Sequence, residues 1–215
     1  MKKAAIICAG SIQDYDYVAT CISDADFVIC ADAGILHVER LGVKPDVWVG
    51  DFDSFKSCGQ PLPECAKYAQ KIGLLCEKDD TDTEHCLTVA VENGCTHAVI
   101  AGAAGTRLDH TVANMLLLRR FALFGIDAYM VNENNRVHYL GGGTLKLNRD
   151  SRFKYVSVIA LDAEISGVTL HGFKYPLEMA KICRGSSLGI SNEIIGDCAT
   201  VCIEHGEALI VESCD

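Results

Sequence analysis

Short apolar runs alternate with amphipathic stretches along residues 1–134 of the chain. Five of the runs have the length and composition of buried strands, and they cover residues 4–9, 27–30, 47–49, 98–101 and 128–131. Between them, apolar side chains recur at helical spacing in residues 35–41, 83–92 and 110–124. Strands that alternate with helices predict an α/β domain with a mainly parallel, Rossmann-like sheet.

Two of the expected helices carry N-terminal signals. Thr81 and Glu84 fit the Ser/Thr-x-x-Glu capping box, which predicts a helix whose first residue is Asp82. Asp109 is a preferred N-cap residue, and it predicts the start of the helix that follows Arg107. Both helices should therefore begin beside acidic side chains, which favour the free N–H groups of a first turn.

From residue 135 onward the pattern changes to short strands separated by turns. The expected strands are residues 136–140, 144–147, 155–161, 168–170, 198–203 and 208–211. No long helical pattern appears among them. We therefore expect a small antiparallel β-domain, a sandwich or roll, over residues 135–215, after a boundary within residues 132–135.

Composition and charge narrow the class of protein. The chain has 215 residues, of which 49% are hydrophobic and 22% charged, as in a globular protein that is soluble. Its formal net charge of −10 argues against a nucleic-acid partner, because binding to nucleic acid relies on Lys and Arg at the phosphates. No apolar run approaches the roughly 18 residues of a membrane span, so we expect no membrane partner.

The twelve cysteines are the other unusual count. The closest pair, Cys198 and Cys202, has no further Cys or His at zinc-site spacing. The apolar run at residues 4–9 ends too early for a secretory signal. We interpret the cysteines as reduced, small core residues of a cytoplasmic protein, whereas a thiol-based redox function would rest on the count alone.

An acidic pair follows the third expected strand. Asp51 and Asp53 flank Phe52, and in an extended chain both carboxylates would point to one side while the phenyl ring turns away. Ligands bind at this end of the strands in open α/β sheets, and paired carboxylates there suit Mg²⁺. The alternative interpretation is a solvated loop that precedes a helix.

A second acidic cluster, residues 78–84, lies where a helix is expected to begin. Its acids suit the helix dipole without any further function. Asp82 at the first helical position could instead complete a three-carboxylate metal site with Asp51 and Asp53.

Two more loops at strand ends carry polar chemistry. Residues 102–110 run from a strand through small residues into a helix, a geometry that offers N–H groups to phosphate, and Arg107 could add a bidentate contact. His110 and Asn114 share a face of that helix. Asp32, after the second strand, could cap a helix or bind a ligand. Together the four loops suggest Mg²⁺-assisted handling of a nucleotide polyphosphate.

In combination, these segments resemble the thiamine pyrophosphokinase family. The resemblance is carried by residues 31–34, 44–46, 50–54, 78–84, 102–114 and 191–193. Ala33 stands where the family usually has a second glycine. The match at residues 191–193, which resembles the family's thiamine-contacting segment, is the shortest.

The resemblance implies transfer of pyrophosphate from ATP to the hydroxyl group of thiamine, which gives thiamine diphosphate and AMP. It also implies an α/β domain for ATP and metal over residues 1–134 and a β-domain for thiamine and dimer contacts over residues 135–215. The enzyme would be a homodimer with its active sites at the subunit interface.

Roles for individual residues follow from combining the resemblance with the chemistry of the loops. We expect Mg²⁺ to bind Asp51, Asp53 and Asp82, and catalysis to depend on Asp53, Asp82 and Arg107. Thiamine would contact Ser191 and Asn192. The residues expected to bind ATP are Asp32, Gly34, Thr81, Arg107, Asp109, His110 and Asn114.

Two alternatives belong to other functions. A pyrophosphokinase for another alcohol, such as a pterin, would keep the ATP and metal loops and change the surroundings of Ser191 and Asn192. A nucleotide-binding module without turnover would not need the paired carboxylates.

A basic stretch at Lys146, Arg149, Arg152 and Lys154 is either a solvated strand face or a phosphate contact.

Overall fold

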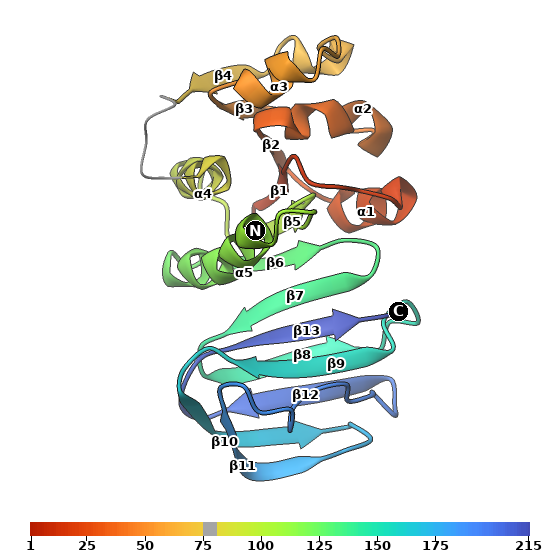
Figure 1. The fold of residues 1–215 in the computed structure, drawn as a ribbon, viewed down its shortest axis with the longest axis vertical. Coiled ribbons are helices and arrows are strands. Elements are labelled where there is room, and N and C mark those ends of the chain that lie inside the picture. Colours follow the sequence, from red (N-terminus) through yellow and green to blue (C-terminus); the bar gives the residue numbers. More distant parts are fainter. Residues whose placement is uncertain (75–80) are drawn as a thin grey trace. The chain divides into compact units, whose positions relative to one another are not determined.

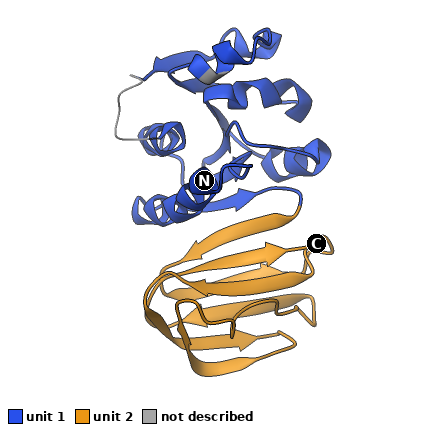
Figure 2. Ribbon diagram, viewed as in Figure 1, with its two compact units in different colours: residues 1–133 blue, residues 134–215 orange. Residues whose placement is uncertain are grey.

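The computed structural model of the protein describes residues 1–74 and 81–215. The chain divides into two compact units, Met1–Glu133 and Asn134–Asp215 (Figure 2). None of the helices in the described part of the chain combines the length and apolar character that a bilayer crossing requires.

The first unit contains a parallel sheet, as the alternating pattern predicted. Its strands lie in the order β4-β3-β2-β1-β5-β6, and each is parallel to its neighbour. The strand bounds are β1 Lys3–Ile7, β2 Phe27–Ala31, β3 Val47–Gly50, β4 Gln70–Gly73, β5 His97–Ala101 and β6 Asp127–Val131.

Helices cover both faces of this sheet. Figure 1 shows α4 and α5 on one side and α1 and α2 on the other. Burial on both faces explains why the strands are continuous apolar runs rather than alternating ones. The helical segments are α1 Tyr15–Ile22, η1 Asp32–His37, α2 Val38–Leu41, α3 Asp53–Ser57, η2 Glu64–Ala66, α4 Asp82–Glu92 and α5 Leu108–Leu123.

The direction of strand addition reverses beside β1. From β1 the chain adds β2, β3 and β4 outward on one side, and α4 then carries it back to β5 on the other side of β1. The connections after β1 and β5 therefore leave the sheet in opposite directions. Such a reversal opens a crevice at the carboxyl ends of the two strands, which is where open α/β sheets bind ligands.

The second unit consists of two antiparallel sheets, as the sequence predicted for this half. One has the order β7-β13-β9 and the other β11-β10-β12-β8. One apolar core joins them, for example through Val158 and Ile210 from the first sheet and Ile165 and Val201 from the second. The strand bounds are β7 Asn135–Leu140, β8 Gly143–Asn148, β9 Tyr155–Ala160, β10 Glu164–His171, β11 Leu177–Cys183, β12 Cys198–Ile203 and β13 Ala208–Ser213.

Candidate active site

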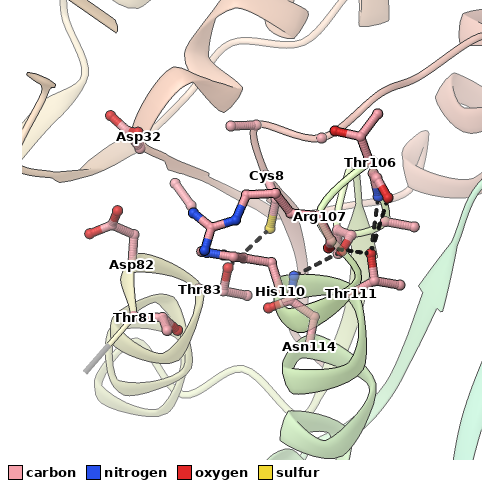
Figure 3. A pocket seen from close by; sticks show the side chains of 17 residues that line it. Cys8, Asp32, Thr81, Asp82, Thr83, Thr106, Arg107, His110, Thr111 and Asn114 are labelled. Carbon is pink, nitrogen blue, oxygen red and sulfur yellow. Dashed lines mark hydrogen bonds between the residues drawn. The ribbon is translucent and has the colours of Figure 1, made fainter. Parts of the chain in front are cut away.

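A pocket of about 420 Å³ lies in the first unit where the strand order reverses (Figure 3). Four chain segments line it: residues 8–10 after β1, residues 31–32 at the end of β2, residues 81–83 at the start of α4, and residues 102–107 after β5. His110, Thr111 and Asn114 of α5 complete the lining. Three of the four segments directly follow strands, so the fold itself assembles the pocket.

The backbones after β1 and β5 are in direct contact. The Gly10 N–H donates to the Gly102 carbonyl at 2.7 Å. A Cβ atom at Gly10 would lie 2.4 Å from the Ala104 oxygen, and Gly102 has a φ of +65°, so both positions require glycine. This close approach makes residues 8–10 and the loop at residues 102–105 one continuous wall of the pocket.

Side chains of α5 hold the loop that precedes the helix. The Asn114 side-chain amide is buried and donates to the Ala103 carbonyl at 2.8 Å. The Thr111 hydroxyl accepts from the Gly105 N–H at 3.2 Å and donates to the Arg107 carbonyl at 3.1 Å. His110 and Asn114 both line the pocket, as their shared helix face predicted. The loop is therefore fixed close to the start of a helix, where an anion is favoured.

Arg107 lines this pocket, but Asp109 does not cap the helix as expected. The N-cap position belongs to Arg107, α5 begins at Leu108, and Asp109 lies in its first turn. The Arg107 Nη2 and Asp109 Oδ2 atoms form an exposed ion pair at 2.6 Å. The hydrogen bond raises the pKa of Arg107 and lowers that of Asp109. Asp109 is absent from the described pocket lining but pairs with Arg107, which belongs to that lining.

Thr81 and Asp82 stand at the start of α4, as predicted. The Thr81 hydroxyl accepts from the Glu84 N–H at 3.2 Å, which confirms Thr81 as the N-cap. In a full capping box the Glu84 carboxylate would bond back to the Thr81 N–H. Here that carboxylate pairs with Arg120 of α5 instead. This pair links the two helices that border the pocket and leaves Asp82 at its wall.

Asp32 lies on the same side of the pocket as Asp82 (Figure 3). It is buried and adopts a φ of +47°, a left-handed conformation that is strained for a residue with a Cβ atom. Two neighbours hold it: the Trp48 indole N–H donates to its carbonyl at 2.8 Å, and Gly50 packs against its backbone. The surrounding core thus fixes the backbone of Asp32 at the edge of the pocket.

The pair Asp51 and Asp53 is arranged differently from the expectation. Phe52 has a φ of +64°, and Asp53 begins α3, so the segment is not extended and the two carboxylates do not align through an alternating strand. Instead, Asp51 accepts from the Asp53 N–H at 3.0 Å, and Asp53 pairs with Lys56. Phe52 does turn into packing, edge-on to Trp48 with ring centroids 4.5 Å apart.

The expected three-carboxylate cluster is likewise not formed in the described residues. No group of three or more His, Cys, Asp or Glu side chains there could hold a metal ion, and of the acids only Asp32 and Asp82 line the pocket. Like charges without a counter-charge repel, which disfavours a closer gathering. Lys78, Asp79 and Asp80 of the second acidic cluster lie outside the described residues.

Gly34 has a packing role instead of lining the described pocket. A Cβ atom there would lie 2.1 Å from the Ile7 carbonyl oxygen, so η1 can approach the end of β1 only with glycine at this position. The contact places Asp32, two residues earlier, beside the chain that leaves β1.

Several lining residues were not predicted from the sequence. Gly10 lies in the loop after the first strand, which the strand order makes central. Thr83 is buried, and its hydroxyl lies 3.5 Å from the Cys8 Sγ. Burial raises the pKa of Cys8 to about 11, so the thiol stays neutral at physiological pH. The available signal was Gly10, which directly follows the expected apolar strand at residues 4–9.

In the second unit, Ser191 and Asn192 differ sharply from each other. Asn192 is buried, and backbone groups occupy its side chain: its Oδ1 accepts from the Tyr175 and Glu193 N–H groups, and its Nδ2 donates to the Tyr175 carbonyl at 2.7 Å. Ser191 is exposed with a φ of +58°, and its N–H donates to the Ser157 hydroxyl. Asn192 therefore shapes the turn that presents Ser191.

Comparisons with known proteins identify the family. The thiamin pyrophosphokinase catalytic domain matches residues 18–130, and the thiamin pyrophosphokinase vitamin B1 binding domain matches residues 143–210. The chain is 32% identical to the thiamine pyrophosphokinase of Bacillus subtilis over 89% of its own length and 86% of that protein. The chain belongs to the thiamine pyrophosphokinase family.

Solved structures of thiamine pyrophosphokinases share the whole fold. The Bacillus subtilis structure superposes with a TM-score of 0.87 at 27% identity and covers all of both chains. The Geobacillus thermodenitrificans structure has a TM-score of 0.82 at 30% identity and covers 99% of this chain and 98% of that one. The family's catalytic-domain match contains most of the pocket, and its vitamin B1 binding match contains Ser191 and Asn192.

Proposed function

We propose that this protein is a thiamine diphosphokinase that transfers the pyrophosphoryl group of ATP to thiamine. The hydroxyl oxygen of thiamine forms a bond to the β-phosphorus. The bond from that phosphorus to the oxygen bridging the α- and β-phosphates breaks, AMP leaves with the electron pair, and the hydroxyl proton passes to a base. The products are thiamine diphosphate and AMP.

Membership of the thiamine pyrophosphokinase family carries this proposal, because both family domains match in order along the chain. The pocket supports it with a glycine loop, a helix start and Arg107 at the point where strand order reverses. We propose that ATP binds there in the manner of Rossmann-like folds, with its phosphates at the loop of residues 102–105.

The donor set on one side of the pocket fits Mg²⁺. Asp32 and Asp82 both line that side, and Mg²⁺ in proteins takes one or two carboxylates together with substrate phosphates. We propose that these two residues would hold it, with Asp51 and Asp53 as further predicted ligands at the adjoining end of β3. When bound, the ion would offset the negative charge of the triphosphate.

The protein's own residues would position the substrates and stabilise the charge of the transferring group. Arg107 would contact the transferring phosphates with a planar, bidentate guanidinium, and Asp109 would orient it. Thr81, His110 and Asn114 border the same pocket and would position the nucleotide. Asp53 or Asp82 would accept the hydroxyl proton. Phosphoryl transfers depend mostly on such positioning and charge stabilisation.

We propose that Ser191 contacts the pyrimidine of thiamine. Its side chain is exposed at a strained residue, a combination found at binding sites, whereas the neighbouring Asn192 supports the turn. A homodimer would bring this segment and an ATP pocket together at the subunit interface. We place the enzyme in the cytoplasm, where buried thiols such as Cys8 and Cys30 would stay reduced.

An incubation with ATP, Mg²⁺ and an acceptor alcohol tests the function. We expect thiamine to yield thiamine diphosphate together with AMP, and a pterin alcohol to yield neither. Turnover with the pterin alone would assign a different acceptor, and tight ATP binding without AMP release would indicate a regulatory module.

A further inference from the structure

A chain of hydrogen bonds runs from α1 into the wall of the ATP pocket. The Tyr15 hydroxyl and the His37 Nδ1 are 2.6 Å apart, and the His37 Nε2 lies 3.0 Å from the Gly10 carbonyl. The Gly10 N–H in turn donates to the Gly102 carbonyl at 2.7 Å. The start of α1, the end of η1 and the loops after β1 and β5 are therefore joined through one imidazole ring and one glycine.

The Gly10 carbonyl determines which atom donates in both hydrogen bonds of His37. A carbonyl oxygen only accepts, so the His37 Nε2 carries a proton and donates it to Gly10. Burial lowers the pKa of His37, which favours the neutral ring. The Nδ1 of a neutral ring with a protonated Nε2 accepts, so Tyr15 donates to it. The required state is the neutral Nε2–H tautomer.

Packing restricts the side chains of Tyr15 and His37 in this series of hydrogen bonds. The Arg40 guanidinium lies 3.6 Å from the centre of the Tyr15 ring, a cation–π contact that holds the phenol beside His37. His37 ends the same short helix, η1, that begins at Asp32 and approaches β1 through Gly34. The imidazole therefore connects the helix that carries a pocket carboxylate to the wall formed by residues 8–10 and 102–105.

We propose that His37 is a positioning residue for ATP: it holds Gly10, and through Gly10 the loop after β5, in the conformation that binds the triphosphate, while Tyr15 holds His37. His37 does not line the described pocket, so it acts through the backbone of Gly10 rather than by contact with the nucleotide. The proposal rests on the proposed function in taking ATP as the ligand of this pocket.

Three variants separate positioning from simple stability. His37→Leu removes both hydrogen bonds, and Tyr15→Phe removes only the phenol's donor while keeping its ring. His37→Gln retains a donor and an acceptor on one side chain and can rescue the chain of bonds. His97→Leu is the matched control, because His97 lies at the first residue of β5, at the opposite end of the strands from the pocket.

Calorimetric titration with Mg²⁺-ATP, without thiamine, gives the direct readout. We expect His37→Leu to weaken binding about tenfold and Tyr15→Phe about threefold, in line with the net worth of one or two hydrogen bonds. His37→Gln should recover most of the loss, and His97→Leu should bind within about twofold of wild type. In turnover, KM for ATP should rise while KM for thiamine and kcat change little.

A lowered Tm for His37→Leu with unchanged ATP affinity in the folded fraction would overturn the proposal, as would an unchanged affinity in Tyr15→Phe. Should His37→Leu fail to fold, Tyr15→Phe and His37→Gln still decide it. Wild-type protein that binds ATP without pyrophosphorylating thiamine would overturn the proposed function and leave the comparison of variants valid. Wild-type protein that does not bind ATP would overturn both.

Discussion

Asp82 has one position that the local sequence determines and another that only the fold determines. It occupies the first position of a capped helix, which the sequence signals directly, and it faces a pocket that only the fold creates. Its carboxylate shares one side of that pocket with Asp32, although 50 positions separate them in the numbering.

Replacing Asp82 with Asn tests its role in charge handling. We expect kcat to fall by about tenfold or more at an unchanged Tm, because the amide keeps the volume and loses the charge that would hold Mg²⁺. Steady-state kinetics at several Mg²⁺ concentrations measure this. Asp127→Asn, at the first residue of β6, is the control, and equal activity of the two variants would refute the assignment.

Cys8 provides a pH test inside the same pocket. Burial raises its pKa to about 11, against 9.0 for an ordinary thiol, so the folded protein keeps the proton longer than the unfolded chain. Its contribution to stability is therefore complete below about pH 9 and declines as pH rises toward 11. We expect iodoacetamide to spare Cys8 in the folded protein at pH 8 and to label it after unfolding, as peptide mass spectrometry can show. Rapid labelling of folded protein would contradict this.

Substitutions at Ser191 and Asn192 should have different effects, one on thiamine binding and the other on stability. Ser191→Ala removes an exposed hydroxyl, so we expect a higher KM for thiamine with an unchanged Tm. Asn192→Ala removes a buried side chain and leaves three part-buried backbone groups without their partner, which should lower stability by about 1–3 kcal/mol. Thermal unfolding together with thiamine kinetics distinguishes them, and a stable Asn192→Ala protein with only a KM defect would reverse the two roles.

Among the elements, five of the six strands of the first unit could be predicted because they are buried and therefore form continuous apolar runs. The helix α1 could not, since only Val18 and Ile22 are buried among its eight residues. The edge strand β4 was missed for a similar reason: its sequence Gln-Lys-Ile-Gly has no apolar run. Local patterns report burial, so elements at edges and surfaces escape them.

Helix caps were likewise predicted where the signal is local and misassigned where it is not. Thr81 was recognised because its partner, the Glu84 N–H, is three residues away in sequence. Asp109 was misassigned because its side chain pairs with Arg107, which displaced the capping role. The left-handed conformations of Asp32 and Phe52 have no local sequence signal, since the core around Trp48 imposes them.

Gly34 tests how closely η1 must approach β1. We expect Gly34→Ala to lower Tm by several degrees and to weaken ATP binding, because the added methyl would lie 2.1 Å from the Ile7 oxygen and displace the helix that carries Asp32. Gly196→Ala is the control, since nothing lies within 4 Å of its added carbon. Equal Tm values for both variants would show that η1 can shift without cost.

For the whole molecule, the net charge of −10 first argued only against nucleic acid. The structure sharpens that statement, because two of the acids, Asp32 and Asp82, gather at a pocket where a metal-bound nucleotide would fit. The sequence identified the loops that carry this chemistry, while their meeting place depends on the order of the strands. That order is a property of the assembled sheet and of no single segment.

Subunit assembly is also a whole-molecule prediction. We expect light scattering to report a homodimer, with twice the mass of the 23.2 kDa chain. A dimer that places Ser191 of one subunit at the pocket of the other should also show concentration-dependent activity near its dissociation constant. A monomer with full specific activity would contradict the shared site.

Phosphorus NMR of the reaction tests the proposed pyrophosphoryl transfer without a coupled assay. We expect wild-type protein with ATP, Mg²⁺ and thiamine to produce thiamine diphosphate and AMP in equal amounts, with no ADP, because attack occurs at the β-phosphorus. Formation of ADP with thiamine monophosphate, or no consumption of thiamine, would contradict it.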